Sequence, residues 1–215
     1  MVEKLCRSCT DCAIVNCSKH DRRYPEFCLT TQLEQQELDD VVDLYTNDPL
    51  VKKITQASAQ VEGRFYGLYT RVEELMEFSQ RIGARKIGIA TCVGLINESR
   101  VLTKILRFNG FEVYGVACKV GVIDKKDMGI EQEFIMKEGE SICNPILQAK
   151  LLEKVGTELN VVVGLCIGHD SLFYKYSHTT TTTLVTKDRV LGHNPVACLY
   201  LTGSYYRKLL TKKTV

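Results

Sequence analysis

The first 28 residues contain a cysteine pattern that is typical of metal ligands. Three cysteines recur at spacings of three, and a fourth follows shortly after them: Cys6, Cys9, Cys12 and Cys17. Thiolates bind zinc and iron–sulfur clusters, and cysteines at these successive spacings resemble the ferredoxin arrangement more than the separated pairs of zinc fingers. We therefore favour an iron–sulfur cluster of the 4Fe–4S type, with zinc or no metal at all as the alternatives.

Two neighbouring residues could replace members of this set, namely His20 and Cys28. Ser18 stands after the last of the four cysteines, where bacterial ferredoxins have proline. The segment has few apolar residues and could not fold by burial alone, so it needs a cross-link or a metal. We expect residues 1–30 to form a small metal-binding cap.

A second group of cysteines follows short apolar runs that are typical of buried strands. Each is followed within a few residues by a glycine: Cys92 by Gly94, Cys118 by Gly121 and Cys166 by Gly168. The carboxyl ends of parallel strands share one edge of a sheet, where ligands bind in open α/β folds. We expect these thiols to line a cofactor site at that edge. The alternative is that each cysteine is a small buried side chain of the core.

Cys143 and His193 each precede an Asn-Pro pair. Asparagine is a good N-cap and proline a good first helical residue, so both side chains should lie just before a helix, whose positive end favours a thiolate. Ordinary helix starts explain the asparagine and the proline but not the cysteine or the histidine. Cys143 therefore joins Cys92, Cys118 and Cys166 as a candidate cofactor ligand.

His169 and Asp170 follow the third buried strand directly and add an imidazole and a carboxylate to the same edge. Lys119 and residues 187–189 could add charge there. The candidate catalytic residues are Cys143, Cys166, His169 and His193. We expect Cys198 to be a core residue of a closing helix over 195–210.

The periodicity of apolar residues predicts an α/β fold with a mainly parallel sheet and flanking helices. The cap and a helical arm precede it, giving a cap over 1–30, an arm packed on the core over 31–84 and an α/β domain over 85–215. The arm should hold helices over 31–48, 49–66 and 71–82. Strands are expected over 86–92, 111–118 and 160–166, with an edge strand over 180–190 and helices over 97–108, 145–155 and 195–210.

Composition excludes several classes of function. The chain has 215 residues and a formal net charge of +2, which gives no electrostatic basis for binding nucleic acid. We see no apolar run long enough to cross a membrane and no signal peptide, and expect a cytoplasmic location. Motifs of phosphate-binding loops, dinucleotide-binding folds, serine hydrolases and zinc proteases are also missing from the sequence.

Six segments together resemble a known family, the domain of unknown function 1847. They are the N-terminal cysteine run and residues 89–95, 117–121, 143–145, 164–170 and 187–195. The resemblance covers nearly the whole chain and implies a small cysteine-rich protein that binds metal, without implying a particular reaction. Residues 178–183, a histidine and five threonines, depart from the family pattern.

Three functions are compatible with these residues. The first is an iron–sulfur redox protein with one cluster in the cap and a second cysteine-lined site at the sheet edge, passing electrons between a partner protein and a small substrate. The second is a binding module whose cap is stabilised by zinc and whose α/β domain holds a small anion. The third is a metal-free thiol enzyme with Cys143 or Cys166 as nucleophile and His169 or His193 as base. Whether the chain is an enzyme, and its oligomeric state, stay open.

Overall fold

The computed structural model describes residues 7–12, 14–19, 21 and 23–211. The chain divides into two compact units, Met1–Gln60 and Val61–Val215, and each unit is described by itself. Cys6 and His20, both named above as candidate ligands, lie outside the described residues. Within the described part of the chain, no helix combines the length and the apolar character needed to cross a membrane.

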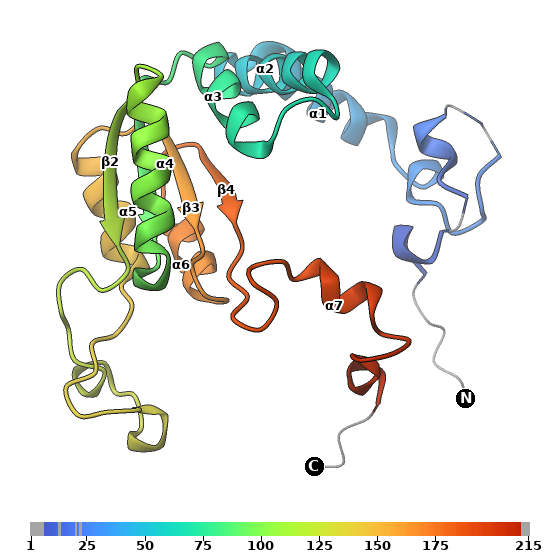
Figure 1. The fold of residues 1–215 in the computed structure, drawn as a ribbon. Coiled ribbons are helices and arrows are strands. Elements are labelled where there is room, and N and C mark those ends of the chain that lie inside the picture. The colour runs from blue at the N-terminus through green and yellow to red at the C-terminus, as the bar shows by residue number, and fades with distance from the viewer. Residues whose placement is uncertain (1–6, 13, 20, 22, 212–215) are drawn as a thin grey trace. The chain divides into compact units, whose positions relative to one another are not determined.

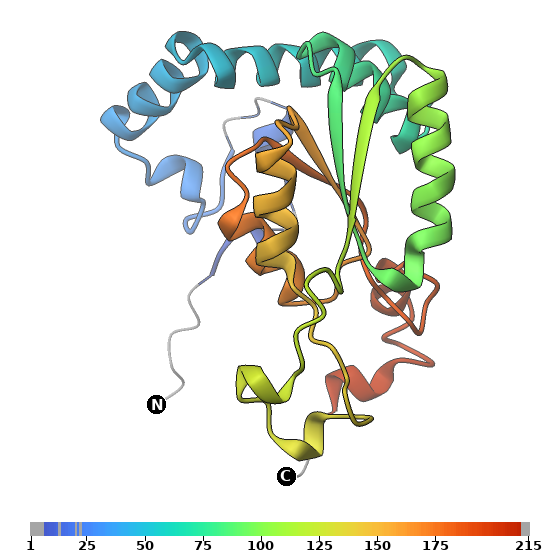
Figure 2. The same ribbon diagram turned by 90° about the vertical axis from the view of Figure 1, so that its left-hand side faces the viewer.

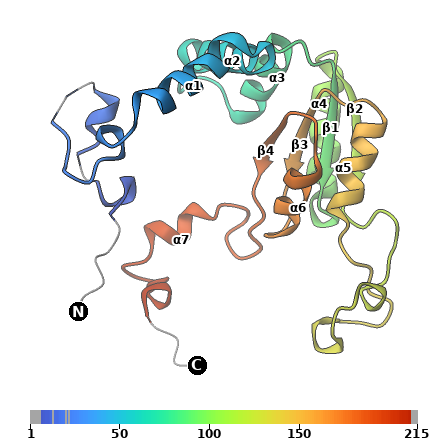
Figure 3. The ribbon, with the colours of Figure 1, turned by 180° about the vertical axis from the view of Figure 1, so that it is seen from behind.

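The unit Val61–Val215 is built on a four-stranded parallel sheet, which confirms the predicted α/β fold (Figure 1). The strand order is β2-β1-β3-β4, so the order reverses beside β1, and β4 forms one edge next to β3 (Figure 3). The strands are β1 Lys86–Thr91, β2 Glu112–Ala117, β3 Leu159–Val163 and β4 Thr181–Val185. Because all four run in the same direction, their carboxyl ends share one edge.

Helices cover both faces of this sheet, and Figure 2 shows α4 and α5 on opposite sides of it. Alternate residues of the strands divide between two cores, as expected for a sheet buried on both faces. Ile87 and Ile89 of β1 pack with α3 and α4, whereas Ala90 packs with α5 and α6. The helices are α3 Arg71–Arg81, α4 Ile96–Phe108, α5 Pro145–Lys154 and α6 His169–Tyr176.

The same alternation places two of the cysteines. Cys92 lies two residues after Ala90, and Cys118 lies two residues after Val116, so both thiols fall on the face that α5 and α6 cover. Both cysteines are buried in that core, and Cys143 packs against it.

The unit Met1–Gln60 consists of short 3₁₀ turns followed by helices. The turns are η1 Cys9–Asp11, η2 Asn16–Ser18 and η3 Leu29–Thr31, and the helices are α1 Gln35–Asn47 and α2 Pro49–Phe65, whose last residues belong to the other unit. Glu34 and Glu37 form a capping box at the start of α1, and Pro49 opens α2. The apolar side chains of α1 are exposed: Leu38, Val41, Val42, Leu44 and Tyr45.

The predicted closing helix over 195–210 is wrong. The chain forms only α7 Val196–Tyr200 there, then turns, and ends in the 3₁₀ helix η7 Arg207–Leu210. Tyr200 and Leu210 are strongly exposed, so the apolar residues of this segment lack the packing that normally stabilises a helix. Cys198, expected in the core, is only partly buried, and its thiol donates a hydrogen bond to the Pro195 carbonyl at 3.0 Å.

A long loop, residues 119–142, leaves the sheet after β2 and returns to the start of α5. Figure 1 shows it extending beyond the carboxyl ends of the strands. Its two arms run antiparallel at their base: the Ile142 amide donates to the Ile123 carbonyl at 2.8 Å, and Lys125 pairs with Glu140 at 2.9 Å. It contains two short 3₁₀ turns, η5 Lys126–Met128 and η6 Gln132–Phe134. We call residues 119–142 the protruding loop.

Gly88 lies in the middle of β1, opposite Asn160 of β3. A side chain on Gly88 would place its Cβ against Asn160 Oδ1, closer than two such atoms can approach. The buried Asn160 amide accepts a hydrogen bond from the Thr157 hydroxyl at 2.8 Å and donates one to Ser177 Oγ at 3.1 Å. Glycine at this position therefore leaves room for a polar network that links β3 to the loops on either side of it.

Gly88→Ala should lower the free energy of unfolding by about 1–3 kcal/mol, because the added methyl group has to displace the buried Asn160 amide. Gly63→Ala is the matched control: it lies in α2, where an added Cβ meets nothing within 4 Å. Alanine in a helix should be neutral or stabilise by up to about 1 kcal/mol. Chemical denaturation of both variants tests this, and equal stabilities would contradict the packing described for β1.

Candidate functional site

The strongest cluster of reactive side chains lies at the carboxyl edge of the sheet, where the protruding loop begins and ends. Cys118 follows β2, Cys143 precedes α5, and their sulfur atoms are 3.7 Å apart. The Asn144 amide donates a hydrogen bond to the Cys118 carbonyl at 2.6 Å. The Val93 amide points at the Cys118 sulfur from 3.4 Å. Backbone contacts thus hold the two thiols together.

The surroundings of the pair favour a thiolate on Cys143. The pKa of the Cys143 thiol is lowered to about 4, chiefly by a hydrogen bond from Cys118. A hydrogen bond from His169 and the positive charge of Lys119 lower it further, and together these effects outweigh burial, which raises it. The pKa of Cys118 is raised, because its thiol is hydrogen-bonded to Cys143, is buried and faces the charges of Cys143 and Cys92. The pair therefore holds one negative charge, on the sulfur that lies nearer to solvent.

Local sequence explains how these side chains reach the edge. Asn144 caps α5 by accepting a hydrogen bond from the Leu147 amide at 3.0 Å, and Pro145 opens the helix, as predicted for Cys143-Asn-Pro. His169 is the first residue of α6, which the sequence did not predict. Gly168, at φ 82°, makes the sharp turn between β3 and this helix.

A buried glutamine ties the two strand ends to α5. Gln148 is fully buried, and its Nε2 donates to the Thr91 carbonyl at 3.1 Å and to the Val116 carbonyl at 2.7 Å. These carbonyls lie in β1 and β2, just before Cys92 and Cys118. Sequence reasoning missed Gln148, although a polar residue among the apolar positions of a predicted helix is a usable signal.

The other predicted thiols of the edge have different surroundings. Cys92 is buried close enough to Cys118 for its charge to raise the pKa of that thiol. Cys166 follows β3 and accepts a hydrogen bond from the Arg189 guanidinium at 2.9 Å. The hydrogen bond described for the Cys166 thiol is thus with the loop after β4 rather than with Cys118 or Cys143. The structure brings Cys92, Cys118, Cys143 and His169 together and leaves the Cys166 thiol beside them.

His193 lies in a separate, shallow pocket of about 420 Å³ beside β4, with Arg71, Thr183 and Pro195 in its lining. Its backbone has φ 66°, and its Nδ1 accepts a hydrogen bond from the Asp188 amide at 3.2 Å. Arg71 donates to the Thr183 carbonyl at 2.9 Å. None of the interactions described for His193 involves a cysteine, so the two candidate histidines occupy different surroundings.

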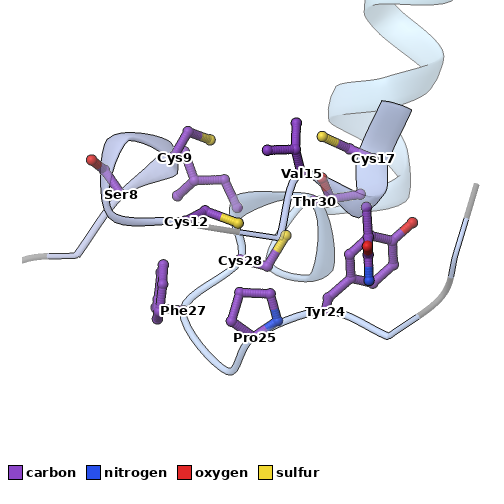
Figure 4. Close-up of a pocket in the computed structure, with 12 residues that line it drawn as sticks. Ser8, Cys9, Cys12, Val15, Cys17, Tyr24, Pro25, Phe27, Cys28 and Thr30 are labelled. Atoms are coloured by element: carbon purple, nitrogen blue, oxygen red, sulfur yellow. The ribbon is translucent and has the colours of Figure 1, made fainter. Parts of the chain in front are cut away.

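The described cysteines of the cap surround one small cavity of about 90 Å³ (Figure 4). The cysteines that line it are Cys9, Cys12, Cys17 and Cys28. Tyr24, Pro25 and Phe27 complete much of its wall. The Thr30 hydroxyl holds the pKa of the Cys28 thiol below its usual value. The four thiols that the structure describes in the cap therefore share a single hollow.

Among the described residues, no group of three or more cysteine, histidine or acidic side chains is arranged closely enough to hold a metal ion as it stands. Each described cysteine is a free thiol. Metal binding by the cap and by the sheet edge therefore stays a prediction.

Comparison with known proteins agrees with the resemblance seen in the sequence. The family described as "Protein of unknown function (DUF1847)" matches residues 28–184. This chain belongs to that family. It is also similar to the uncharacterized protein MJ0455 of Methanocaldococcus jannaschii, with 50% identity over 161 residues, which cover 75% of this chain and 82% of the relative.

The matched range contains every cysteine of the sheet edge but only Cys28 of the cap. Cys92, Cys118, Cys143, Cys166 and His169 all lie within residues 28–184, as does Cys28. The other four cysteines of the cap, together with His193 and Cys198, lie outside it. The thiol cluster at the sheet edge is thus contained in the part of the chain that matches the family.

The pKa of Cys143 predicts alkylation at unusually low pH. In metal-free protein, iodoacetamide should modify Cys143 with a midpoint near pH 4, far below the ordinary thiol value of about 8.5. Because the pKa of Cys143 is lower in the folded than in the unfolded protein, ionisation of this thiol stabilises the fold. This contribution to the free energy of unfolding is present above about pH 8.5 and is lost as the pH falls through the pKa of the folded state.

Cys118→Ala removes the hydrogen bond that contributes most to the low pKa of Cys143, so it should raise the midpoint pH of Cys143 alkylation. The control Cys198→Ala should leave this midpoint unchanged. Peptide mass spectrometry of protein alkylated across a pH series gives the midpoint for Cys143 alone. A midpoint near the ordinary thiol value, or one that Cys118→Ala does not move, would contradict the charge assignment.

Proposed function

We propose that this protein binds metal through cysteine thiolates at the carboxyl edge of its sheet. The observation that carries the proposal is the separation of 3.7 Å between the Cys118 and Cys143 sulfurs. Two thiolates that share one tetrahedral metal, each about 2.3 Å from it, lie about 3.8 Å apart. The pair therefore has the spacing that a shared metal requires.

Cys92 and His169 are the nearest candidates for completing the ligand set. Cys92 is buried beside Cys118, and the His169 imidazole already hydrogen-bonds to Cys143. A set of thiolates with an imidazole suits zinc and iron–sulfur clusters rather than calcium or magnesium, which prefer oxygen ligands. These side chains would have to move to close the set, since no three such groups among the described residues are arranged to hold a metal as they stand. Cys166, held by Arg189, is a neighbouring group that could tune the site.

The cap is the second proposed metal site. Cys9, Cys12, Cys17 and Cys28 line one cavity, and the sequence places Cys6 three residues before Cys9. The spacing of the first three cysteines favours a 4Fe–4S cluster over zinc. With iron–sulfur clusters the protein would transfer electrons between a partner protein and a small substrate, whereas with zinc the cap would contribute folding energy only.

Metal analysis of variants tests the proposal. Full-length protein purified without oxygen should contain iron and acid-labile sulfide, or zinc, and Cys143→Ser should lose the part bound at the sheet edge. Cys9→Ser should lose the part bound in the cap. Cys198→Ser, which changes a cysteine outside both groups, should retain the full metal content. Unaltered metal content in Cys143→Ser would contradict the edge site, and a visible absorption spectrum distinguishes brown iron–sulfur protein from colourless zinc protein.

A further inference from the structure

We propose that Cys118 and Cys143 also form a redox-active dithiol, which reacts with small disulfides when no metal is bound. This activity goes beyond metal binding, since it uses the two sulfurs as reacting atoms instead of ligands. It rests on three observations: the distance between the sulfurs, the way the protruding loop closes, and the unequal exposure of the two thiols.

The sulfurs are already in contact at 3.7 Å, and a disulfide bond requires a separation of about 2.05 Å. The backbone at both residues is fixed by the Asn144 amide, which donates to the Cys118 carbonyl. The two sulfurs therefore need to approach each other by about 1.7 Å, while this backbone hydrogen bond holds their two segments side by side.

The protruding loop keeps this pair together at its base. Asp124 and Ser141 form an antiparallel bridge, and the Lys119 ammonium donates to the Ser141 carbonyl at 2.5 Å. These contacts connect the two arms next to the thiols. A disulfide between Cys118 and Cys143 would close the loop at its base, where these hydrogen bonds already hold the two arms together.

Exposure gives the two thiols different parts in the reaction. Cys143 is partly exposed and lies beside the positive charge of Lys119, whereas Cys118 has only 2% of its surface exposed. An incoming molecule can reach Cys143 but not Cys118. Cys143 is therefore the attacking thiol, and Cys118 is the resolving thiol behind it.

The exchange takes place in two balanced steps. The Cys143 thiolate attacks one sulfur of a small disulfide R–S–S–R, a Cys143–S–S–R bond forms, and one R–S⁻ leaves and takes a proton from water. Cys118 then gives its proton to water, its sulfur attacks the Cys143 sulfur, and the second R–S⁻ leaves and is protonated. The two protein thiols are oxidised to one disulfide, and the small disulfide is reduced to two thiols.

The experiment uses full-length protein stripped of metal and exposed to glutathione disulfide or 2-hydroxyethyl disulfide, followed by peptide mass spectrometry without reduction. The unchanged protein should yield a peptide pair joined through Cys118 and Cys143, with the loss of about two free thiols for each bond formed. Cys118→Ser should stop after the first step and accumulate a mixed disulfide at Cys143. Cys143→Ser should leave Cys118 unmodified.

Cys198→Ser is the matched control, because Cys198 lies outside both cysteine groups, and it should still form the Cys118–Cys143 bond. Circular dichroism confirms that each variant is folded before it is treated. The proposal is overturned if Cys143 joins Cys92 or Cys166 instead, or if folded Cys118→Ser gains no mixed disulfide at Cys143. These results are independent of metal content, so failure of the exchange and failure of the proposed metal site are distinguishable.

Discussion

The site depends on one contact, the hydrogen bond that the backbone amide of Asn144 donates to the Cys118 carbonyl. Parallel strands alone bring Cys92 and Cys118 to the same edge, but Cys143 lies 25 residues further along the chain. The protruding loop returns antiparallel to its outgoing arm and delivers Cys143 to that edge. With this contact in place, three thiols, an imidazole and an ammonium group from separate segments of the chain lie at one edge of the sheet.

Partial burial gives this arrangement its chemical character. A thiolate removed from water is costly unless hydrogen bonds and positive charges compensate, and here Cys118, His169 and Lys119 supply both. The compensation is unequal, so the negative charge rests on the sulfur closer to solvent. A soft anionic sulfur in such a position can bind a metal or attack another sulfur. The two proposed functions are thus alternative uses of one constellation.

Much of the fold could be predicted because its signals are local. The apolar runs before Cys92, Cys118 and Cys166 are strands or strand ends, and Asn144-Pro145 begins a helix as expected. What the sequence could not provide was long-range pairing. Nothing in residues 119–142 indicates that the loop returns antiparallel, and the hydrogen bond between Arg189 and Cys166 joins segments whose neighbourhood depends on strand order.

The errors have a similar origin. The helix predicted over 195–210 had suitable periodicity, but its apolar residues find little to pack against, and propensity alone did not sustain it. The sequence offered His169, after a strand, and His193, before a predicted helix, as equal candidates for a catalytic base. The fold distinguishes them, since α6 carries His169 to Cys143, while the loop after β4 takes His193 to the pocket with Arg71.

The most direct test of a metal site at the sheet edge is X-ray absorption spectroscopy of full-length protein in which Cys6, Cys9, Cys12 and Cys17 have been changed to serine. Without these four thiols in the cap, we expect the remaining metal to have at least two sulfur neighbours at about 2.3 Å. These would be the sulfurs of Cys118 and Cys143. A metal with only nitrogen and oxygen neighbours, or a folded protein that retains no metal, would contradict it.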